Sequence, residues 1–251
     1  MAGSFVNRFA LLTVALLAGG AAHAADSPTA RQTVTIAELF PPAEAALLSR
    51  TMRTDRRVIF HVRVPPGSAP HGVLVFVHPG NDAEPMAGWE EILDRRDLVW
   101  IAAEGFGNDK PGNQRALVAL LALKHLSRTT SLDPARRYVA GMSGGGKIAS
   151  QVLTRFPGFF DGALCIVGAD PVAPAVLHAP EMTAKRVVFM TGDRDFNHYD
   201  VLEVYKRFVA AGVTNSHLLD IEGFSHQYPD ARQLDAALDL LDPRQGRAIA
   251  Q

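Results

Sequence analysis

The chain has 251 residues and a formal net charge of −1, with positive and negative side chains interspersed along it. This balance leaves no footprint for nucleic acid or an anionic membrane, so we expect neither as a partner. Because Cys165 is the only cysteine, an intramolecular disulfide is excluded.

The first 24 residues have the layout of a secretory signal peptide. Arg8 precedes an apolar run from Phe9, and Ala22-His23-Ala24 is a small-residue cleavage pattern. The apolar run, roughly 14 residues, is shorter than the ~20 that a membrane-spanning helix needs. No cysteine stands directly after the cleavage pattern to carry a lipid anchor. We therefore expect residues 1–24 to be removed and the protein to be secreted or periplasmic.

From residue 30 to 242, short apolar segments rich in Val and Ile alternate with stretches of helical period. This pattern predicts an α/β fold, a mostly parallel sheet of eight strands with helices on both faces. No composition break divides the region, so we expect one domain over residues 25–251, with 243–251 loosely ordered. The expected strands are 33–39, 57–64, 73–77, 97–103, 137–142, 162–168, 186–191 and 216–221. The expected helices are 84–95, 113–128, 145–156, 198–211 and 231–241, the last with Asp230 as its N-cap.

In such a sheet, reactive residues lie in loops after the carboxyl ends of the strands. The segment YVAGMSGGGKIASQ, residues 138–151, contains one of these loops and allows two interpretations. As a phosphate-binding loop, Gly141 to Lys147 fits G-x-x-x-x-G-K, but Ile148 stands where a Ser or Thr hydroxyl should bind magnesium. As a nucleophile elbow, Gly141 to Gly145 fits G-x-S-x-G between an expected strand and an expected helix. That context favours the elbow, with Ser143 as the nucleophile.

Glycine is expected in the elbow for a steric reason, and the elbow can also bind a negative charge. Side chains two residues before or after Ser143 would strike the neighbouring strand and helix. Gly144 sits at the first turn of that helix with its N–H free, so it can bind an anionic oxygen in an oxyanion hole. The second N–H donor is expected after strand 73–77, in His78-Pro79-Gly80-Asn81. Because proline has no N–H, Gly80 is the first choice and Asn81 the second.

A serine hydroxyl needs a base to take its proton, and the base needs a carboxylate to hold its tautomer. Asp193 and Asp195 follow strand 186–191, and His226 follows strand 216–221. We favour Asp195 as the acid and His226 as the base. Asp193 remains an alternative acid, and His198 an alternative base near the acid loop.

The order Ser143, Asp195, His226 resembles that of the α/β-hydrolase superfamily. Within it, residues 131–169 are similar to secreted poly(3-hydroxybutyrate) depolymerases and feruloyl esterases, in which Asp-Pro-x-Arg precedes the elbow strand and Phe-Pro follows the elbow helix. The resemblance implies a carboxylic ester hydrolase with those three residues as nucleophile, acid and base. The sequence differs from the group in its single cysteine, its lack of a polymer-binding module and its HPGND segment. A small or oligomeric ester is therefore the expected substrate, rather than a solid polymer.

This chemistry needs no cofactor, and no histidine pair has the spacing of a zinc site, so we expect neither cofactor nor metal. The same triad cleaves amides and thioesters, which makes a peptidase or a thioesterase the closest alternative. A non-catalytic binding protein on the same fold is an alternative of another class. The segment between strands 162–168 and 186–191 is too short for a large lid. The residues considered for the acyl or alcohol pocket, although such residues more often belong to the core, are Trp89, Phe106, Met142 and Phe196.

Overall fold

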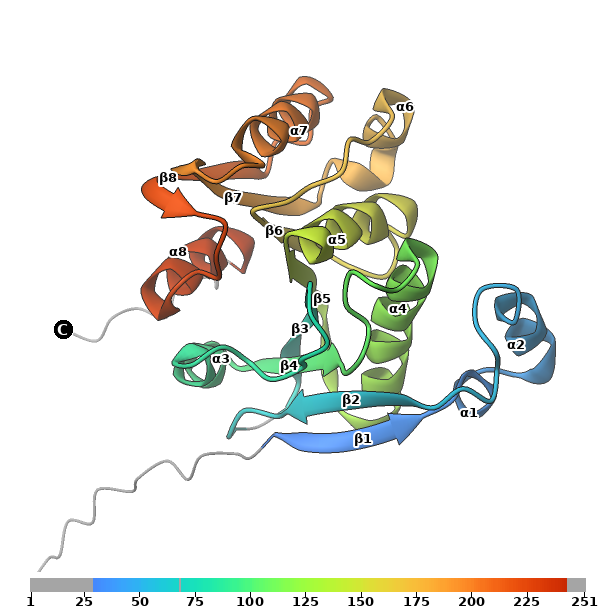
Figure 1. Cartoon of the computed structure of the whole chain (residues 1–251). Coiled ribbons are helices and arrows are strands. Elements are labelled where there is room, and N and C mark those ends of the chain that lie inside the picture. The colour runs from blue at the N-terminus through green and yellow to red at the C-terminus, as the bar shows by residue number, and fades with distance from the viewer. Residues whose placement is uncertain (1–28, 68, 243–251) are drawn as a thin grey trace, which may run out of the picture.

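The computed structural model describes residues 29–67 and 69–242 (Figure 1). The expected signal peptide, residues 1–24, and the expected loose tail, residues 243–251, lie outside these residues. Within the described ranges, no helix is both long enough and apolar enough to cross a membrane.

In the described residues, eight strands form one sheet in the order β1-β2-β4-β3-β5-β6-β7-β8. β2 runs antiparallel to both of its neighbours, and the other neighbouring pairs are parallel. The predicted eight-stranded, mostly parallel sheet is therefore confirmed. The strands are β1 (Ala30–Val34), β2 (Val58–Arg63), β3 (His71–Val77), β4 (Leu98–Ala103), β5 (Leu132–Met142), β6 (Gly162–Ile166), β7 (Arg186–Arg194) and β8 (Ser216–Ser225).

Helices cover both faces of the sheet, as predicted (Figure 1). Successive strand residues face opposite sides, so Leu74 and Phe76 pack with one layer of helices, while Val73 and Val75 pack with the other. The first layer consists of α3 (Trp89–Arg96) and α8 (Ala231–Leu241). The main helices of the second layer are α4 (Gly112–Thr129), α5 (Gly144–Arg155) and α7 (His198–Ala210). Cys165 is buried in the second layer, away from solvent.

The expected strand at residues 33–39 is wrong beyond its first two residues. β1 ends at Val34, and α1 (Ile36–Leu39) follows. Thr35 caps this helix, because its hydroxyl accepts from the Glu38 N–H while the Glu38 carboxylate accepts from the Thr35 N–H. Such a capping box satisfies two free N–H groups and starts a helix where the apolar residues alternate as in a strand.

Three short helical segments are absent from the sequence-based expectation. They are α2 (Pro42–Leu48), α6 (Pro174–Leu177) and a single 3-10 turn (Pro180–Met182). Each begins with a proline, whose fixed φ suits the first helical position and whose missing N–H would have no partner there. The last two are the only helical segments between β6 and β7 in the described chain. That segment therefore holds two single turns.

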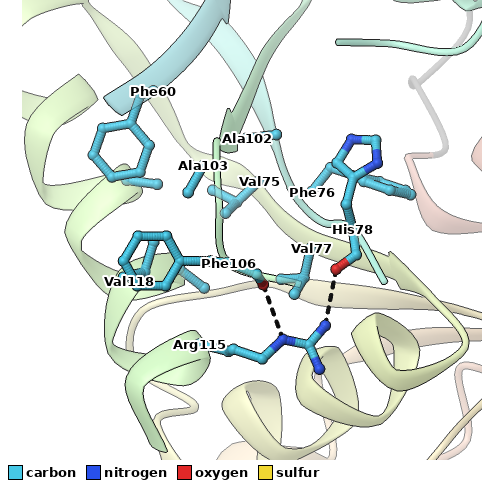
Figure 2. A pocket seen from close by; sticks show the side chains of 12 residues that line it. Phe60, Val75, Phe76, Val77, His78, Ala102, Ala103, Phe106, Arg115 and Val118 are labelled. Atoms are coloured by element: carbon cyan, nitrogen blue, oxygen red, sulfur yellow. Dashed lines mark hydrogen bonds between the residues drawn. The ribbon is translucent and has the colours of Figure 1, made fainter. Parts of the chain in front are cut away.

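The first half of α4 packs over β3 and β4 (Figure 2). Arg115, Val118 and Ala119 lie on one side of the helix because they are three and four residues apart. A cavity of about 10 Å³ remains between this side and the strands. Such a volume is at the limit for one water molecule, so it cannot hold part of a substrate. Arg115 is the charged residue in this otherwise largely apolar lining.

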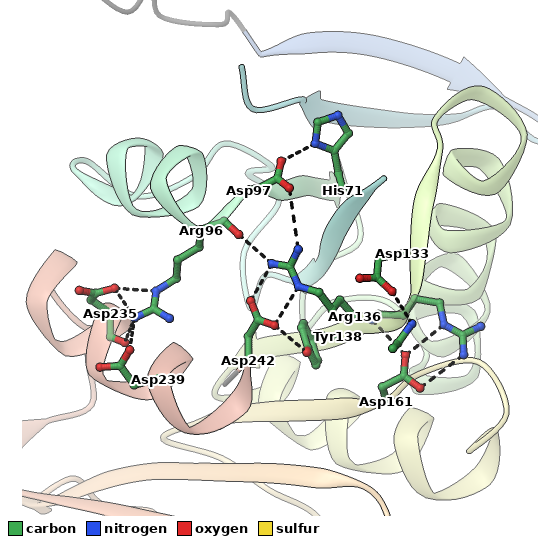
Figure 3. A network of polar contacts seen from close by, with 12 residues as sticks. His71, Arg96, Asp97, Asp133, Arg136, Tyr138, Asp161, Asp235, Asp239 and Asp242 are labelled. Carbon is green, nitrogen blue, oxygen red and sulfur yellow. Dashed lines mark hydrogen bonds and ion pairs between the residues drawn. The ribbon is translucent and has the colours of Figure 1, made fainter. Parts of the chain in front are cut away.

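A polar network ties β5, α3 and α8 together at the amino ends of the parallel strands (Figure 3). Arg136 donates to both carboxylate oxygens of Asp242, at 2.9 and 2.7 Å, and the Tyr138 hydroxyl donates to the same carboxylate at 2.9 Å. Arg136 also donates to the carbonyl of Arg96, which pairs with Asp235 of α8. These bonds brace the scaffold at the edge opposite the expected reactive loops.

Candidate active site

Ser143 lies between β5 and α5 in a conformation that few residues other than glycine adopt. Its φ is 55° and its ψ is −121°. This conformation costs backbone strain and persists only where neighbouring groups hold the residue in place. The Ser143 N–H donates to the Ile166 carbonyl at 2.8 Å, and the Ser143 carbonyl accepts from the Lys147 N–H at 3.1 Å. The end of β6 and the first turn of α5 therefore hold the strained turn from both sides.

Gly141 and Gly145 leave the space that this turn needs, for the steric reason expected from the sequence. A Cβ atom on Gly145 would overlap the carbonyl oxygen of Val77, and one on Gly141 would overlap the carbonyl group of Gly145. Neither obstacle is a flexible side chain. Glycine at both positions therefore allows α5 to begin this close to β3 and β5.

The structure brings Ser143, His226 and Asp195 into one hydrogen-bonded chain. Ser143 Oγ lies 2.9 Å from His226 Nε2, and His226 Nδ1 lies 2.8 Å from Asp195 Oδ1. A proton on Nδ1, shared with the carboxylate, leaves Nε2 as the acceptor for the serine hydroxyl. The side chain of His226 is 20% exposed and that of Asp195 is fully buried, so solvent reaches the imidazole but not the carboxylate.

Three donors hold the buried carboxylate of Asp195. Besides His226, the Thr191 hydroxyl donates to it at 2.9 Å and the Asn197 N–H donates at 3.1 Å. The side-chain amide of Asn197 also donates to the Val167 carbonyl at 2.8 Å, which links the loop after β7, the one that carries Asp195, to the loop after β6. A buried carboxylate is costly unless its oxygens accept hydrogen bonds, and these bonds meet that need while fixing its orientation.

The two alternative residues have other partners. Asp193 accepts from the Gly223 N–H at 2.5 Å and so joins the ends of β7 and β8. His198 begins α7, and its Nδ1 lies 3.5 Å from a carboxylate oxygen of Asp220. Within the described chain, neither side chain forms a hydrogen bond with Ser143.

The two expected oxyanion donors lie in loops at the same edge of the sheet. Gly144 is the first residue of α5, where an N–H has no acceptor within the helix. Gly80 follows β3, and its N–H donates to no other group in residues 29–67 and 69–242. A Cβ on Gly107 would lie 2.7 Å from the Gly80 carbonyl oxygen, so the loop after β4 supports the Gly80 loop closely. Asn81, the second choice, binds the loop after β4. Its backbone carbonyl accepts from the Gly105 N–H, and its side-chain oxygen accepts from the Gly107 N–H.

Of the four residues considered for the substrate pocket, Phe196 is the exposed one. Its side chain is 77% exposed and stacks on the imidazole of His226, with ring centroids 3.9 Å apart. Trp89, Phe106 and Met142 are buried and belong to the core. The apolar surface beside the candidate base therefore comes from the loop that also carries Asp195.

Sequence reasoning assigned no role to His78, which links the loop after β3 to the loop after β8. It follows β3 directly, and its Nδ1 lies 3.2 Å from the hydroxyl of Tyr228, two residues after His226. Burial lowers the pKa of His78 to about 4, so the ring is neutral at pH 7. The rings of Phe76 and Trp100 pack against it edge-on. The sequence shows only a histidine directly after an expected strand and two residues before Gly80, and this position alone does not identify Tyr228 as its partner.

No protein-family model matches the chain, and no curated protein is similar to it in sequence. Solved structures do share its fold. A ferulic acid esterase is 16% identical to this chain and superimposes with a TM-score of 0.61. The match covers 84% of this chain and 94% of the esterase chain. S-formylglutathione hydrolase from Staphylococcus aureus is 14% identical with a TM-score of 0.60, covering 86% and 99%. An acylaminoacyl peptidase from Pyrococcus horikoshii is 12% identical with a TM-score of 0.55, covering 68% of this chain and 36% of its own.

Proposed function

We propose that this chain, which has the α/β-hydrolase fold, is a serine hydrolase that cleaves carboxylic esters through an acyl-enzyme intermediate. The observation that carries the proposal is the hydrogen-bonded chain from Ser143 Oγ through His226 to Asp195, with distances of 2.9 and 2.8 Å. Strain at Ser143, a buried acid and an accessible base are the features that this chemistry requires.

In the first step, Ser143 Oγ attacks the carbonyl carbon of the ester while His226 Nε2 takes the hydroxyl proton. The carbonyl oxygen becomes an anion, held by the N–H groups of Gly144 and Gly80. Asp195 stabilises the imidazolium that forms. Collapse of the tetrahedral intermediate breaks the bond to the leaving oxygen, and His226 gives its proton to the departing alcohol.

The second step repeats the first with water as the nucleophile. His226 takes a proton from water as the water oxygen attacks the acyl group on Ser143, and the same two N–H groups bind the new oxyanion. The bond to Ser143 Oγ then breaks, the serine recovers its proton and the carboxylic acid leaves. Proton transfer and charge stabilisation come from this chain's own groups, so the reaction needs no added cofactor.

A small or oligomeric ester with an apolar group near the scissile bond is the proposed substrate. Phe196 supports this choice, because its exposed ring lies directly against His226 and can cover such a group. The likeness to a ferulic acid esterase also favours an ester. Thioesters and amides are the competing substrates, since a thiol-ester hydrolase and a peptidase have the same fold.

We propose further that the protein acts outside the cytoplasm. The support is the sequence of residues 1–24, in which Arg8, an apolar run and Ala22-His23-Ala24 follow one another in the order of a signal peptide. N-terminal sequencing of the protein recovered from the periplasm or medium should begin at Ala25. Recovery from the cytoplasm with residues 1–24 intact would contradict export.

A substrate panel tests the proposed activity. It comprises p-nitrophenyl esters of graded chain length, methyl ferulate, hydroxybutyrate oligomers, and a thioester and an anilide of one matched acid. We expect ester hydrolysis that is lost in Ser143→Ala, with kcat/KM for the ester above that for the matched amide. Faster cleavage of the anilide or the thioester would assign the protein to the competing class. Hydrolysis that survives in Ser143→Ala would contradict the proposed site.

A further inference from the structure

The guanidinium of Arg115 connects three loops at the edge of the sheet that carries Ser143. Nε donates to the Phe106 carbonyl at 3.1 Å, Nη2 to the His78 carbonyl at 2.9 Å and Nη1 to the Gly144 carbonyl at 3.3 Å. Figure 2 shows the first two of these bonds. The three acceptors belong to the segment after β4, the segment after β3 and the start of α5.

This arginine stands where simple stability arguments would not place a cation. Arg115 is in the first turn of α4, where the positive end of the helix dipole disfavours a positive side chain. It is 5% exposed and faces the core, in line with Val118 and Ala119. Its hydrogen-bond acceptors are neutral carbonyls, and no carboxylate of the described residues lies within ion-pair distance. Its Coulombic partner is the exposed Asp109, which is not in direct contact with it. Burial of a charge that lacks a direct ion pair is destabilising, so the three hydrogen bonds must offset this cost.

We propose that Arg115 is the positioning residue of the oxyanion hole, holding the Gly80 and Gly144 N–H groups at the spacing that the reacting oxygen needs. The inference rests on the proposed function. Its bond to His78 fixes the chain two residues before Gly80, with the rigid Pro79 between them. Its bond to Gly144 fixes the residue that supplies the other N–H.

The bond to Phe106 supports the Gly80 loop indirectly, through Gly107. The Phe106 carbonyl accepts from Arg115, and the next residue, Gly107, packs against the Gly80 carbonyl so closely that a Cβ atom would not fit. One planar guanidinium thus spans both donor loops and the loop that supports them. A lysine could not do this, because an ammonium lacks the fixed fork of donors.

The charge of Arg115 adds to this geometric effect. The substrate carbonyl is neutral in the ground state and becomes an anion in the tetrahedral intermediate, so a nearby buried cation stabilises mainly the transition state. Loss of the guanidinium should therefore lower kcat and leave KM nearly unchanged. A residue that only bound the substrate would change KM instead.

The experiment compares Arg115→Met and Arg115→Lys with the control Arg128→Met in the full chain. Arg128 is an exposed arginine on the same helix that also donates to a backbone carbonyl, that of Glu38 at 2.6 Å. The readouts are kcat and KM for one p-nitrophenyl ester, thermal unfolding, and the Ki of phenylboronic acid, which forms an anionic tetrahedral adduct with a reactive serine. We expect kcat of Arg115→Met to fall about 10- to 100-fold, KM to change less than about twofold, and Ki to rise by the factor lost in kcat/KM.

Arg115→Lys keeps the positive charge but loses the planar set of N–H donors, so its kcat should lie between the values for the wild type and Arg115→Met. The control Arg128→Met should have the kcat of the wild type. A folded Arg115→Met with unchanged kcat, or with a changed KM alone, would overturn the inference and leave the proposed function standing. If Arg115→Met does not fold, wild-type kcat in Arg115→Lys would overturn it in the same way. A wild-type protein without Ser143-dependent hydrolysis would refute the proposed function itself.

Discussion

The ring of Phe196 lies face to face with the imidazole of His226, with centroids 3.9 Å apart and planes inclined by 24°. The other face of Phe196 is open to solvent, since the side chain is 77% exposed. An aromatic ring held at a candidate base but left uncovered is a contact surface for an apolar group of the substrate. The same stack limits rotation of the imidazole, whose Nδ1 is already held by Asp195.

Phe196→Ala should lower kcat/KM for esters with a long or aromatic acyl group about fivefold, since a good aromatic contact contributes on the order of 1 kcal/mol. Acetate esters, which cannot reach the ring, should lose less. Tyr199→Ala is the matched control, because Tyr199 is 83% exposed and its ring contacts His198 rather than His226. Equal losses for acetate and long-chain esters would contradict a role in substrate binding.

Asp195→Asn should lower kcat about 10³- to 10⁴-fold, because an amide no longer holds the imidazole in the required tautomer or stabilises its charge. The neighbouring change Asp193→Asn should lower it less than about threefold, because the amide oxygen can still accept from the Gly223 N–H. Steady-state kinetics with one p-nitrophenyl ester measures both. The reverse order of effects would make Asp193 the acid.

Gly80→Pro should lower kcat about 100-fold or more, since proline removes the N–H proposed for the oxyanion. Gly80→Ala keeps that N–H, and its methyl group would have no heavy atom within 4 Å, so it should stay near wild-type activity. Thermal unfolding of both variants checks that the loop change leaves the fold intact. Full activity in a folded Gly80→Pro would assign the second donor elsewhere, with Asn81 as the next residue to test.

His78 should make the protein less stable in mild acid. Burial lowers its pKa to about 4 in the folded protein, whereas an unfolded chain has a histidine pKa of about 6.5. As the pH falls below about 6.5, the unfolded state binds a proton that the folded state does not, so the free energy of unfolding decreases by about 2 kcal/mol between about pH 7.5 and 5.

Urea unfolding of the wild type and of His78→Gln over this pH range measures the contribution, since the remaining groups titrate in both proteins. The wild type should lose about 2 kcal/mol more than the variant. Parallel curves for the two proteins would show that His78 titrates normally in the folded state.

The meeting of Ser143, Asp195 and His226 at one place could be predicted because each residue follows an apolar strand, and parallel strands bring their carboxyl ends to one edge. The strand-turn-helix at Ser143 could also be predicted, because the turn leaves no room for a Cβ atom at Gly141 or Gly145. Local patterns carry this kind of information. The capping box of Thr35 and Glu38 is local too and was available, although the alternating apolar residues around it favoured a strand.

The contacts of Arg115 and His78 could not be predicted in the same way. Arg115 reaches carbonyls 9, 29 and 37 positions away, and His78 reaches Tyr228 150 positions away. Backbone carbonyls occur in every residue, so no side-chain pattern marks them as partners. The stacking of Phe196 on His226 depends on how the loop after β7 packs against the loop after β8, which no local pattern shows.

Covalent labelling with a fluorophosphonate probe tests the central claim most directly, because the probe reacts only with a serine activated by a base. Intact-mass measurement should show one adduct on the wild type, and peptide mapping should place it on Ser143. Folded Ser143→Ala should remain unlabelled, and His226→Asn should react at least about 100-fold more slowly. Folded wild type that stays unlabelled, or that carries its adduct on another residue, would contradict an activated nucleophile at Ser143.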